Sequence, residues 1–540
     1  MPLRLLVFLM TAGLCVAASA QDGPRLPDLG SSAGTVRSPA EDRQIGASML
    51  HQMRALDMVL DDPLTSQYLN HLGYELVAHA HIDKGQQFTF FVVNSDEINA
   101  FAAPGGYIAV NAGLFRATRS EDELAAVLAH EISHVTQHHL LRSTEAARKA
   151  TPLMLLGMLG ALAASSQGGS SGANAGAAVM MGTLGALQQH MITFTRQDEA
   201  EADHVGIALL AEAGFDPDAM AGFFGRMEQL LRPGSGGRQA PELLQTHPVT
   251  SHRISDAKAR AHALEQRMAS QPQGTPGAGA DWATTMAPLP YLKPGSDVLA
   301  QAAHAAAPHA KDPYSLYLLM RERVRVLTGT NRDVVRYYAA NLEHDPGFDT
   351  PSNRYGYALA LTRATRGAEA KKMLAPLLAK RPNMLALQLA MADAELIAGD
   401  RAASLRRYAA QLEGQPESHA VAEAYANALL ASGTPADAKK AADILKPLLD
   451  NEVDEPTLYR VYGHACAVSG QRVRASRAYA DAAFLSGRAT DALNQLQDLL
   501  KEPDLDYYQR ARIQADIDVI KPIALELRRR GIDAEKQGAP

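Results

Sequence analysis

The sequence predicts two regions of different fold class: an α+β domain, mostly helical with a small sheet, and then an all-α tetratricopeptide solenoid. Residues 41–267 combine helical periodicity with short β-branched and aromatic segments. Residues 268–297 are rich in Pro and Gly and read as a linker. From 298 to about 530, Ala-rich helical segments alternate with glycine, and a period near 34 residues is typical of tetratricopeptide repeats. The glycines, spaced by 32, 34 and 37 residues, are Gly367, Gly399, Gly433 and Gly470.

Composition limits the class of protein. The chain has 540 residues, too many for one core, so two or three domains are expected. A hydrophobic content of 46% and a charged content of 21% allow packed cores. The net charge is −7 and no long basic run is present, which argues against a nucleic-acid partner.

The N-terminus resembles an export signal. Arg4 precedes an apolar run that ends in Ala18-Ser19-Ala20, so residues 1–20 are predicted to be a signal peptide cleaved after Ala20. The alternative, a membrane anchor, is disfavoured because the apolar run is short. Residues 21–40 read as an extended arm. The mature chain would keep only Cys466, which excludes an internal disulfide and favours a periplasm over a eukaryotic extracellular space.

Within residues 41–267, periodicity predicts a set of helices and two strands. The helical segments are 41–80, 122–139, 193–217 with its stop at Gly214, and an element around 246–264, while 87–94 and 107–110 read as strands. Residues 151–190 hold two apolar Gly- and Ala-rich runs that are too short to cross a bilayer. They are either two helices packed on the domain or a mobile hairpin that covers a cleft or contacts a membrane surface.

His130, Glu131 and His134 lie in an otherwise apolar helical pattern. Positions i and i+4 share a helix face, so both imidazoles can reach one metal ion, and imidazole nitrogen suits Zn²⁺. Glu131 would lie beside the ion and accept a proton from the attacking water. The apolar setting argues that this helix is buried rather than a surface helix with two histidines. Burying a carboxylate costs free energy, so its presence there indicates a function.

A catalytic zinc needs a third protein ligand, and the segment "EAEAD" offers Glu199 and Asp203 on one helix face. Glu199 can bind the ion, and Asp203 can accept a hydrogen bond from the far nitrogen of a ligand histidine. Glu201 points elsewhere on the helix. His138 and His139 read as a solvated helix end, so one Zn²⁺ per chain is predicted.

The motifs "HEISH", "EAEAD" and "HPVTSHR", with "PGGYIAVNAGL" before them, resemble the M48 family of zinc metallopeptidases. The resemblance implies a zincin-type metalloprotease domain over 41–267, with Glu199 as the third ligand. It also places His247 and Arg253 in the site. His247 would either stabilise the oxyanion of the reaction or bind zinc as a fourth, inhibitory ligand. Arg253 would orient His247 or hold nearby carboxylates.

The resemblance further implies a zinc-dependent endopeptidase in the periplasm of a Gram-negative bacterium. Its substrates would be misfolded or stalled outer-membrane proteins, and its repeats would contact the β-barrel assembly machinery. A substrate would lie extended along an edge strand formed by Tyr107, Ile108, Ala109, Val110 and Asn111. The alternative is a chaperone or docking protein that works through its repeats, with a latent protease site. A closed structural zinc site is disfavoured because it would not need Glu131.

Overall fold

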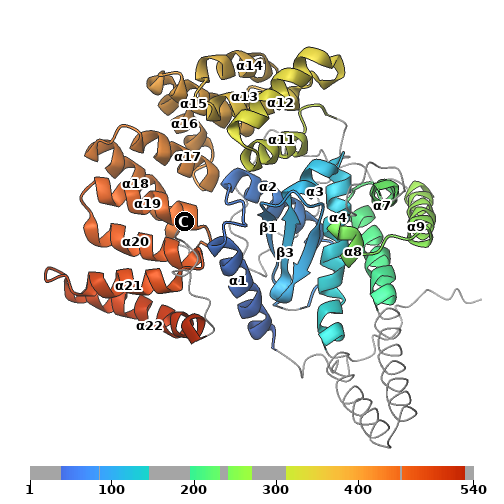
Figure 1. Ribbon diagram of the computed structural model, residues 1–540, viewed down its shortest axis with the longest axis horizontal. Coiled ribbons are helices and arrows are strands. Elements are labelled where there is room, and N and C mark those ends of the chain that lie inside the picture. Colours follow the sequence, from blue (N-terminus) through green and yellow to red (C-terminus); the bar gives the residue numbers. More distant parts are fainter. Residues whose placement is uncertain are drawn as a thin grey trace, which may run out of the picture.

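The computed structural model describes residues 38–83, 85–144, 195–230, 241–270, 312–450 and 453–529. In Figure 1 a small sheet with its covering helices lies beside a curved array of helices from the C-terminal half. The predicted signal peptide, most of the arm, the 151–190 insert and nearly all of the 268–297 linker lie outside the described residues.

The sheet has the strand order β1-β3-β2. Its strands are β1 (Thr89–Val93), β2 (Ala100–Ala103) and β3 (Tyr107–Asn111). β3 pairs in parallel with β1 and antiparallel with β2, so it is the central strand. The expectation that 107–111 forms an edge strand is therefore wrong. The second edge is β2, whose sequence "AFAA" lacks the β-branched residues that signal a strand.

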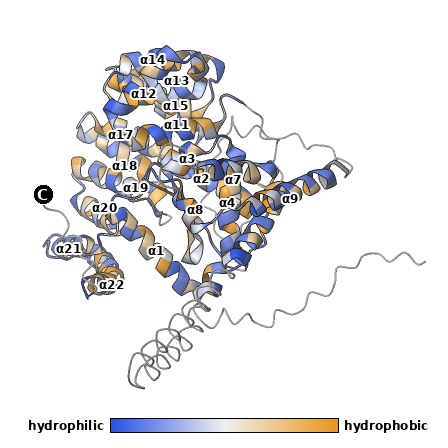
Figure 2. Ribbon diagram, turned by 45° about the vertical axis from the view of Figure 1, so that its right-hand side comes forward, coloured by the Kyte–Doolittle hydropathy of each residue, from blue (hydrophilic) through white to orange (hydrophobic). Residues whose placement is uncertain are grey.

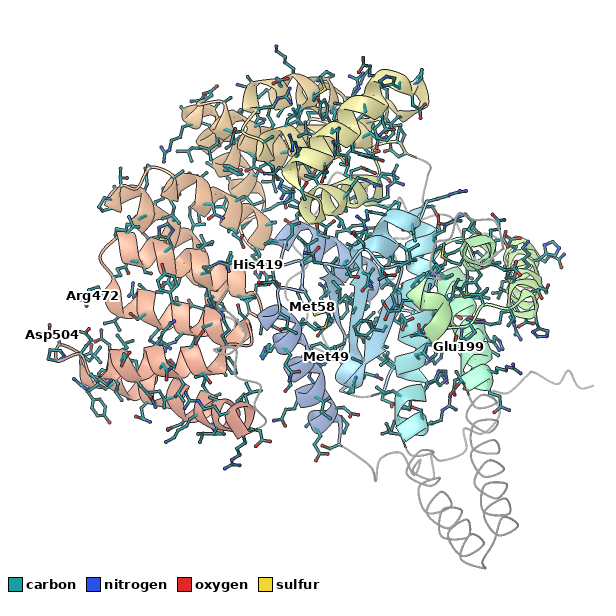
Figure 3. The ribbon with its side chains drawn as sticks, viewed as in Figure 1. Met49, Met58, Glu199, His419, Arg472 and Asp504 are labelled. Atoms are coloured by element: carbon teal, nitrogen blue, oxygen red, sulfur yellow. The ribbon has the colours of Figure 1, made fainter. Side chains whose placement is uncertain are left out.

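Helices cover both faces of the sheet because its strands carry apolar residues on alternate sides. Phe91 and Val93 of β1 pack toward α1 (Pro39–Ala55), while Phe90 and Val92 join the core formed with α2 (Pro63–Val77) and α4 (Glu121–Thr136). Figure 3 places Met49 on α1 and Glu199 on the opposite side of the sheet. The other helical segments around the sheet are α3 (Ala112–Ala117), the stretch 195–212, α7 (Asp218–Leu230), α8 (Glu242–Thr246) and α9 (Ser251–Ser270).

The local sequence explains where α4 begins and ends. Ser120 caps its first turn by accepting a hydrogen bond from the backbone N–H of Glu123 at 3.3 Å. The helix ends at Thr136, and His138 then adopts a left-handed conformation with φ of 56°. A separate helical stretch follows over 139–144. The single helix predicted over 122–139 is thus broken at Gln137 and His138.

The C-terminal region is a series of paired antiparallel helices. Figure 2 shows both hydrophobic and hydrophilic residues along these helices. The helices are α11 (Leu316–Thr328), α12 (Asn331–His344), α13 (Pro351–Arg363), α14 (Gly367–Lys380), α15 (Leu385–Ile397), α16 (Arg401–Gly414), α17 (His419–Leu430), α18 (Pro435–Leu449), α19 (Pro456–Val468), α20 (Arg472–Leu485), α21 (Ala489–Leu500) and α22 (Tyr507–Arg529). This arrangement is that of a helical repeat region.

Three of the four predicted helix-ending glycines do lie in left-handed turns: Gly399, Gly433 and Gly470 have φ between 67° and 86°. Gly367 differs, because it starts α14, and Thr365 takes the left-handed position before it. A Cβ on Gly367 would lie 2.6 Å from the carbonyl oxygen of Ala394. Its role is therefore to let α14 approach α15 closely.

The repeats and the sheet domain share one continuous hydrophobic core, which runs from α2 through α4 and α11 to α20. Polar contacts support it. Arg323 of α11 donates two hydrogen bonds to Asp62, the N-cap of α2, at 2.8 and 2.6 Å. Tyr317 donates to the hydroxyl of Thr118 at 2.8 Å, in the turn before α4. Cys466 is a buried free thiol, so these contacts are noncovalent.

Across the described residues, no helix combines the length and apolar character that a membrane crossing requires.

Candidate metal centre

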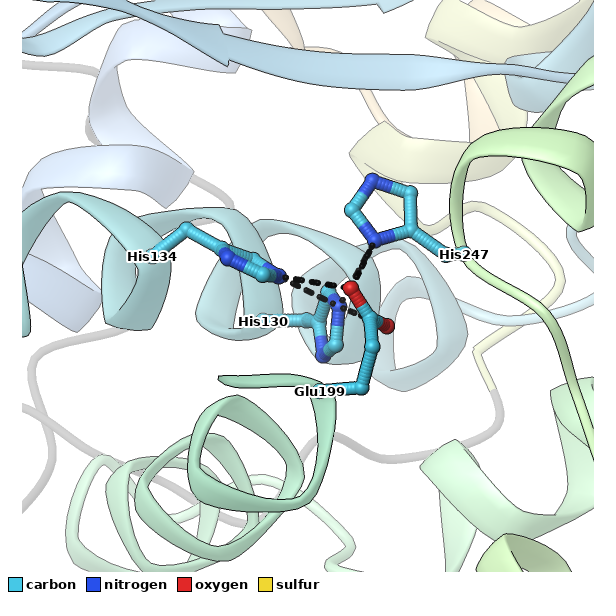
Figure 4. Close-up of side chains that lie close together, drawn as sticks. All are labelled: His130, His134, Glu199 and His247. Carbon is cyan, nitrogen blue, oxygen red and sulfur yellow. Dashed lines mark hydrogen bonds and ion pairs between the residues drawn. The ribbon is translucent and has the colours of Figure 1, made fainter. Parts of the chain in front are cut away.

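Two helices and one loop bring the predicted ligands together. α4 contributes His130 and His134, the 195–212 helix contributes Glu199, and His247 follows the last residue of α8 (Figure 4). The Nε2 atoms of His130 and His134 are 3.0 Å apart. One nitrogen or oxygen atom from each of the four residues lies within 4.8 Å of the others.

Glu199 faces both histidines of α4. Its Oε2 is 3.5 Å from His130 Nε2, and its Oε1 is 3.5 Å from His134 Nε2. His247 Nδ1 lies 2.8 Å from Glu199 Oε1 and 3.4 Å from His130 Nε2. In this conformation His247 is therefore part of the donor cluster, as in the fourth-ligand alternative.

Asp203 and Arg253 support the cluster from behind. Asp203 Oδ1 is 3.1 Å from His130 Nδ1, the nitrogen that points away from the other donors. Arg253 donates two hydrogen bonds of 2.7 Å to Asp203, and its Nη1 lies 2.9 Å from Glu199 Oε2. The same guanidinium donates to the carbonyl oxygen of Pro248 at 2.9 Å. Arg253 thus holds both carboxylates and anchors the loop that carries His247.

Glu131 is fully buried next to the donors. Its Oε1 is 3.7 Å from His247 Nε2, and its carboxylate accepts a hydrogen bond from the backbone of Ala102 in β2. Burial raises the pKa of Glu131 above its ordinary value. A carboxylate whose pKa is raised is better suited to take up and return a proton near neutral pH.

The electrostatics of the cluster favour a cation at its centre. Burial alone would lower the pKa of His130, but the carboxylates of Asp203 and Glu199 raise that pKa to about 10. Burial and the neighbouring His130 lower the pKa of His134, so its imidazole is neutral. Burial would raise the pKa of Glu199, but His130 and His247 lower it and keep the carboxylate ionised.

The donor set fits zinc. Two imidazole nitrogens and one carboxylate oxygen from Glu199 converge, and this His₂Glu combination suits a borderline-soft ion with an open position. Each histidine also has a partner on its remaining nitrogen, as ligand histidines usually do. The residues therefore fit a catalytic zinc ion held by His130, His134 and Glu199.

Residues 107–111 do not line the site in the way expected. All five are buried, and both edges of β3 are already paired. The strand next to Glu131 is β2, through Ala102. Alternating hydrophobicity does not reveal strand order, so the sequence could not distinguish the central strand from the edge.

Sequence reasoning also missed a second polar cluster, formed by His139, Arg142, Asp198 and Glu201. His139 was expected to be solvated, but its side chain is only 5% exposed, whereas that of His138 is 41% exposed. Because His138 adopts a left-handed conformation, the side chains of His138 and His139 point in opposite directions. Glu201 does point away from the metal donors, as predicted, and it faces His139 and Arg142.

Comparison with known proteins gives one family and several relatives. Residues 63–261 match the model of peptidase family M48. The chain is 33% identical over 520 residues to the Beta-barrel assembly-enhancing protease of Escherichia coli (strain K12), which covers 96% of both chains. The protein of the same name from Yersinia pestis is 33% identical over 499 residues, or 92% of this chain and 91% of the relative. The Mitochondrial metalloendopeptidase OMA1 of Arabidopsis thaliana is 28% identical over 212 residues, 39% of each chain.

Proposed function

The chain belongs to peptidase family M48 and is a metalloendopeptidase, and we propose that it is a periplasmic zinc-dependent enzyme that degrades misfolded or stalled outer-membrane proteins. The observation that carries the proposal is the convergence of His130, His134 and Glu199 with the buried Glu131 beside them. The names of the relatives from Escherichia coli and Yersinia pestis support a role in β-barrel assembly.

In this proposal His130, His134 and Glu199 hold one zinc ion, which when bound supplies Lewis acidity to the scissile carbonyl and the attacking water. Glu131 takes the proton from the water and then delivers it to the leaving amine. Its burial supports both transfers because the raised pKa makes the protonated form accessible. Asp203 holds His130 through the nitrogen that faces away from the ion.

His247 restrains the enzyme in the conformation described here. A hydrogen-bond donor for an oxyanion must face the substrate, yet His247 Nδ1 lies 2.8 Å from Glu199 and 3.4 Å from His130. His247 must therefore leave this position before a substrate carbonyl can enter. Replacing His247 by Ala should raise cleavage if restraint dominates, whereas loss of cleavage would favour the oxyanion role.

The substrate lies extended along the edge of β2 on which no other described strand pairs, rather than along β3. The edge of β2 is open to a further strand in the sheet order, and its Ala102 adjoins Glu131. Pairing of this kind needs an extended peptide, so an unfolded segment should be cleaved and a folded protein should resist. This requirement supports a role in removing proteins that have failed to assemble.

The repeat region supports a second activity, docking to the β-barrel assembly machinery with chaperone-like support of assembly. The observation in its favour is the continuous core that joins the repeats to the protease domain, which would place a partner bound to the repeats close to the site. A membrane-surface contact by residues 151–190 belongs to the same proposal, although these residues lie outside the described part of the chain.

The decisive experiment compares wild type with Glu131→Gln, using a disordered test protein and following fragment formation. Glu131→Gln should retain zinc, because Glu131 is not among the donors, and should lose at least about 10³-fold in rate. Unchanged cleavage by Glu131→Gln would contradict the proposed role of this residue. A zinc-loaded variant that no longer cleaves also allows the docking activity to be measured separately.

A further inference from the structure

His139 contacts a metal ligand from a direction that the proposed mechanism does not use. Its Nδ1 is 2.8 Å from Nδ1 of His134, on the side of that ring that faces away from the donor cluster. Its Nε2 is 3.2 Å from Glu201 Oε2. The imidazole of His139 therefore bridges a ligand histidine and a carboxylate.

One set of protonation states satisfies both hydrogen bonds in the series from His134 through His139 to Glu201. If zinc takes the lone pair on His134 Nε2, then His134 Nδ1 carries the hydrogen and donates it. His139 Nδ1 must then be the acceptor, so the hydrogen of His139 is on Nε2. That N–H donates to Glu201, whose ionised carboxylate can only accept.

We propose that His139 is a positioning residue, which fixes the orientation and tautomer of His134 for zinc binding. The inference rests on the proposed zinc site. His130 receives the same support from Asp203 directly, at 3.1 Å. His134 has no carboxylate on its outer nitrogen among the described contacts, and His139 with Glu201 takes that place.

The contact between His139 and His134 forms within a short stretch of sequence. The left-handed conformation of His138 ends α4 and starts the 139–144 stretch, so that His139 points back under the last turn of α4. Beyond Glu201 from His139 lies Arg142, whose guanidinium is 2.6 Å from Glu201 and 3.2 Å from Asp198. Its guanidinium already supplies positive charge there, which disfavours a second metal ion in this cluster.

The experiment measures zinc affinity by chelator competition for the full mature chain and three variants. His139→Phe keeps an aromatic ring but removes the acceptor, and should weaken zinc binding by about 10–100-fold. His139→Asn places an amide oxygen near the position of Nδ1 and should remain within about threefold of wild type. His138→Asn is the matched control, because His138 is exposed and Asn tolerates the left-handed region, and its affinity should equal that of wild type.

A second readout separates positioning from simple destabilisation. The visible absorption of the cobalt-substituted protein should change in His139→Phe and return toward the wild-type spectrum in His139→Asn. If His139→Phe binds zinc as tightly as wild type, or if His139→Asn is as weak as His139→Phe, the proposal is overturned. Failure of the wild type to bind zinc would instead overturn the proposed function.

Should His139→Phe fail to fold, Glu201→Met tests the same chain from its solvent side. The Glu201 side chain is 40% exposed, so its replacement should leave the fold intact. Loss of the acceptor for His139 Nε2 should weaken zinc binding, by less than the loss of His139 itself. Wild-type affinity in Glu201→Met would count against the proposal.

Discussion

Two clusters of arginine and carboxylate, one at the domain interface and one at the site, differ in their charge balance. At the domain interface Arg323 and Asp62 neutralise one another, one cation to one anion. At the site, Arg253 alone faces both Asp203 and Glu199. The interface pair is complete without any ligand. At the site, Arg253 balances one carboxylate and a protonated His130 balances the other, and a metal ion would replace that proton as the second positive charge. The same chemistry thus serves stability in one place and binding in the other.

The largest expected effect comes from removing either arginine. Arg323→Met leaves Asp62 largely buried without its partner and should lower the free energy of unfolding by about 3 kcal/mol, with or without zinc. Arg253→Met removes the guanidinium that Asp203 and Glu199 share, but bound zinc offsets part of that cost. Denaturation of both variants in zinc and in chelator should therefore show a zinc-dependent loss for Arg253→Met only. Equal zinc dependence in the two variants would contradict the proposed difference between the interface pair and the site cluster.

Low pH sharpens the same measurement. Burial would raise the pKa of Asp62, but Arg323 and the hydrogen bonds from Thr65 outweigh it and lower the pKa below the ordinary value of 3.8. A lowered pKa gives stability that is complete above the ordinary value and is lost as the pH falls through the lowered one. In Arg323→Met burial is no longer outweighed by Arg323, so Asp62 should take up a proton at a higher pH than in wild type. The stability difference between the two proteins should therefore shrink as the pH falls, and the decrease should begin above about pH 4.

Replacing both interface partners tests whether the pair stabilises the fold or only avoids a buried charge. The double variant Asp62→Leu with Arg323→Leu should recover most of the loss seen with Arg323→Met, because two apolar side chains replace a pair that was desolvated. Its recovery will be incomplete by about 1 kcal/mol, since Asp62 also caps α2 through Thr65. Unfolding in urea measures both variants. A double variant no more stable than the single one would show that the pair itself is strongly favourable.

A smaller effect tests how closely the two domains approach. Gly487 has φ of 73°, and a Cβ there would lie 2.0 Å from the carbonyl oxygen of His51 in α1. Gly487→Ala should cost about 2–3 kcal/mol, from backbone strain and from separation of α20 and α1. Gly433 has φ of 67° but open space around it, so Gly433→Ala should cost only about 1 kcal/mol. Equal melting temperatures for Gly487→Ala and Gly433→Ala would contradict a tight contact between the two domains at Gly487.

The smallest effect concerns a second interface carboxylate with the opposite pH dependence. Burial raises the pKa of Glu423 to about 7, although Thr457 donates a hydrogen bond to it at 2.9 Å, and Glu455, Asp62 and Arg460 are its charged neighbours. A raised pKa gives stability that is present below the ordinary value of 4.5 and is lost as the pH rises toward 7. Glu423→Gln should therefore be about 1 kcal/mol more stable than wild type at pH 8, a value reduced for partial solvation.

That prediction has a simple check. Melting temperatures of wild type and Glu423→Gln are compared from pH 5 to pH 8, and the gap between them should widen as the pH rises. The lowered pKa of Asp62, which lies near Glu423, should make the wild-type stability fall with falling pH only below about pH 4. The pH ranges in which the two carboxylates affect stability therefore do not overlap. A gap that stays constant over this range would show that Glu423 is ionised throughout.

Much of the site was accessible from the sequence because helical spacing is a strong geometric constraint. His130 and His134 share one face of α4, and Glu199 and Asp203 share one face of the next long helix, so each pair could be placed without tertiary information. The helical class of the C-terminal half followed from its repeated glycines for the same reason. Local periodicity is sufficient wherever the function depends on residues one helical turn apart.

The failures have a different physical origin. Strand order depends on pairing between distant segments, so the central position of β3 and the existence of β2 left no local signal. The burial of His139 depends on a single left-handed residue, His138, which no periodic pattern records. Neither feature is recorded in a local periodic pattern, and both lie next to the site.

The shared core between α11 and the sheet domain bears on what the linker contributes. Tyr317 and Arg323 bind Thr118 and Asp62 across the boundary, and the apolar core continues from one side to the other. The peptide bonds between residues 270 and 312 are therefore not what holds the halves together. We therefore expect two polypeptides made separately, one ending before the linker and one beginning after it, to associate through these contacts.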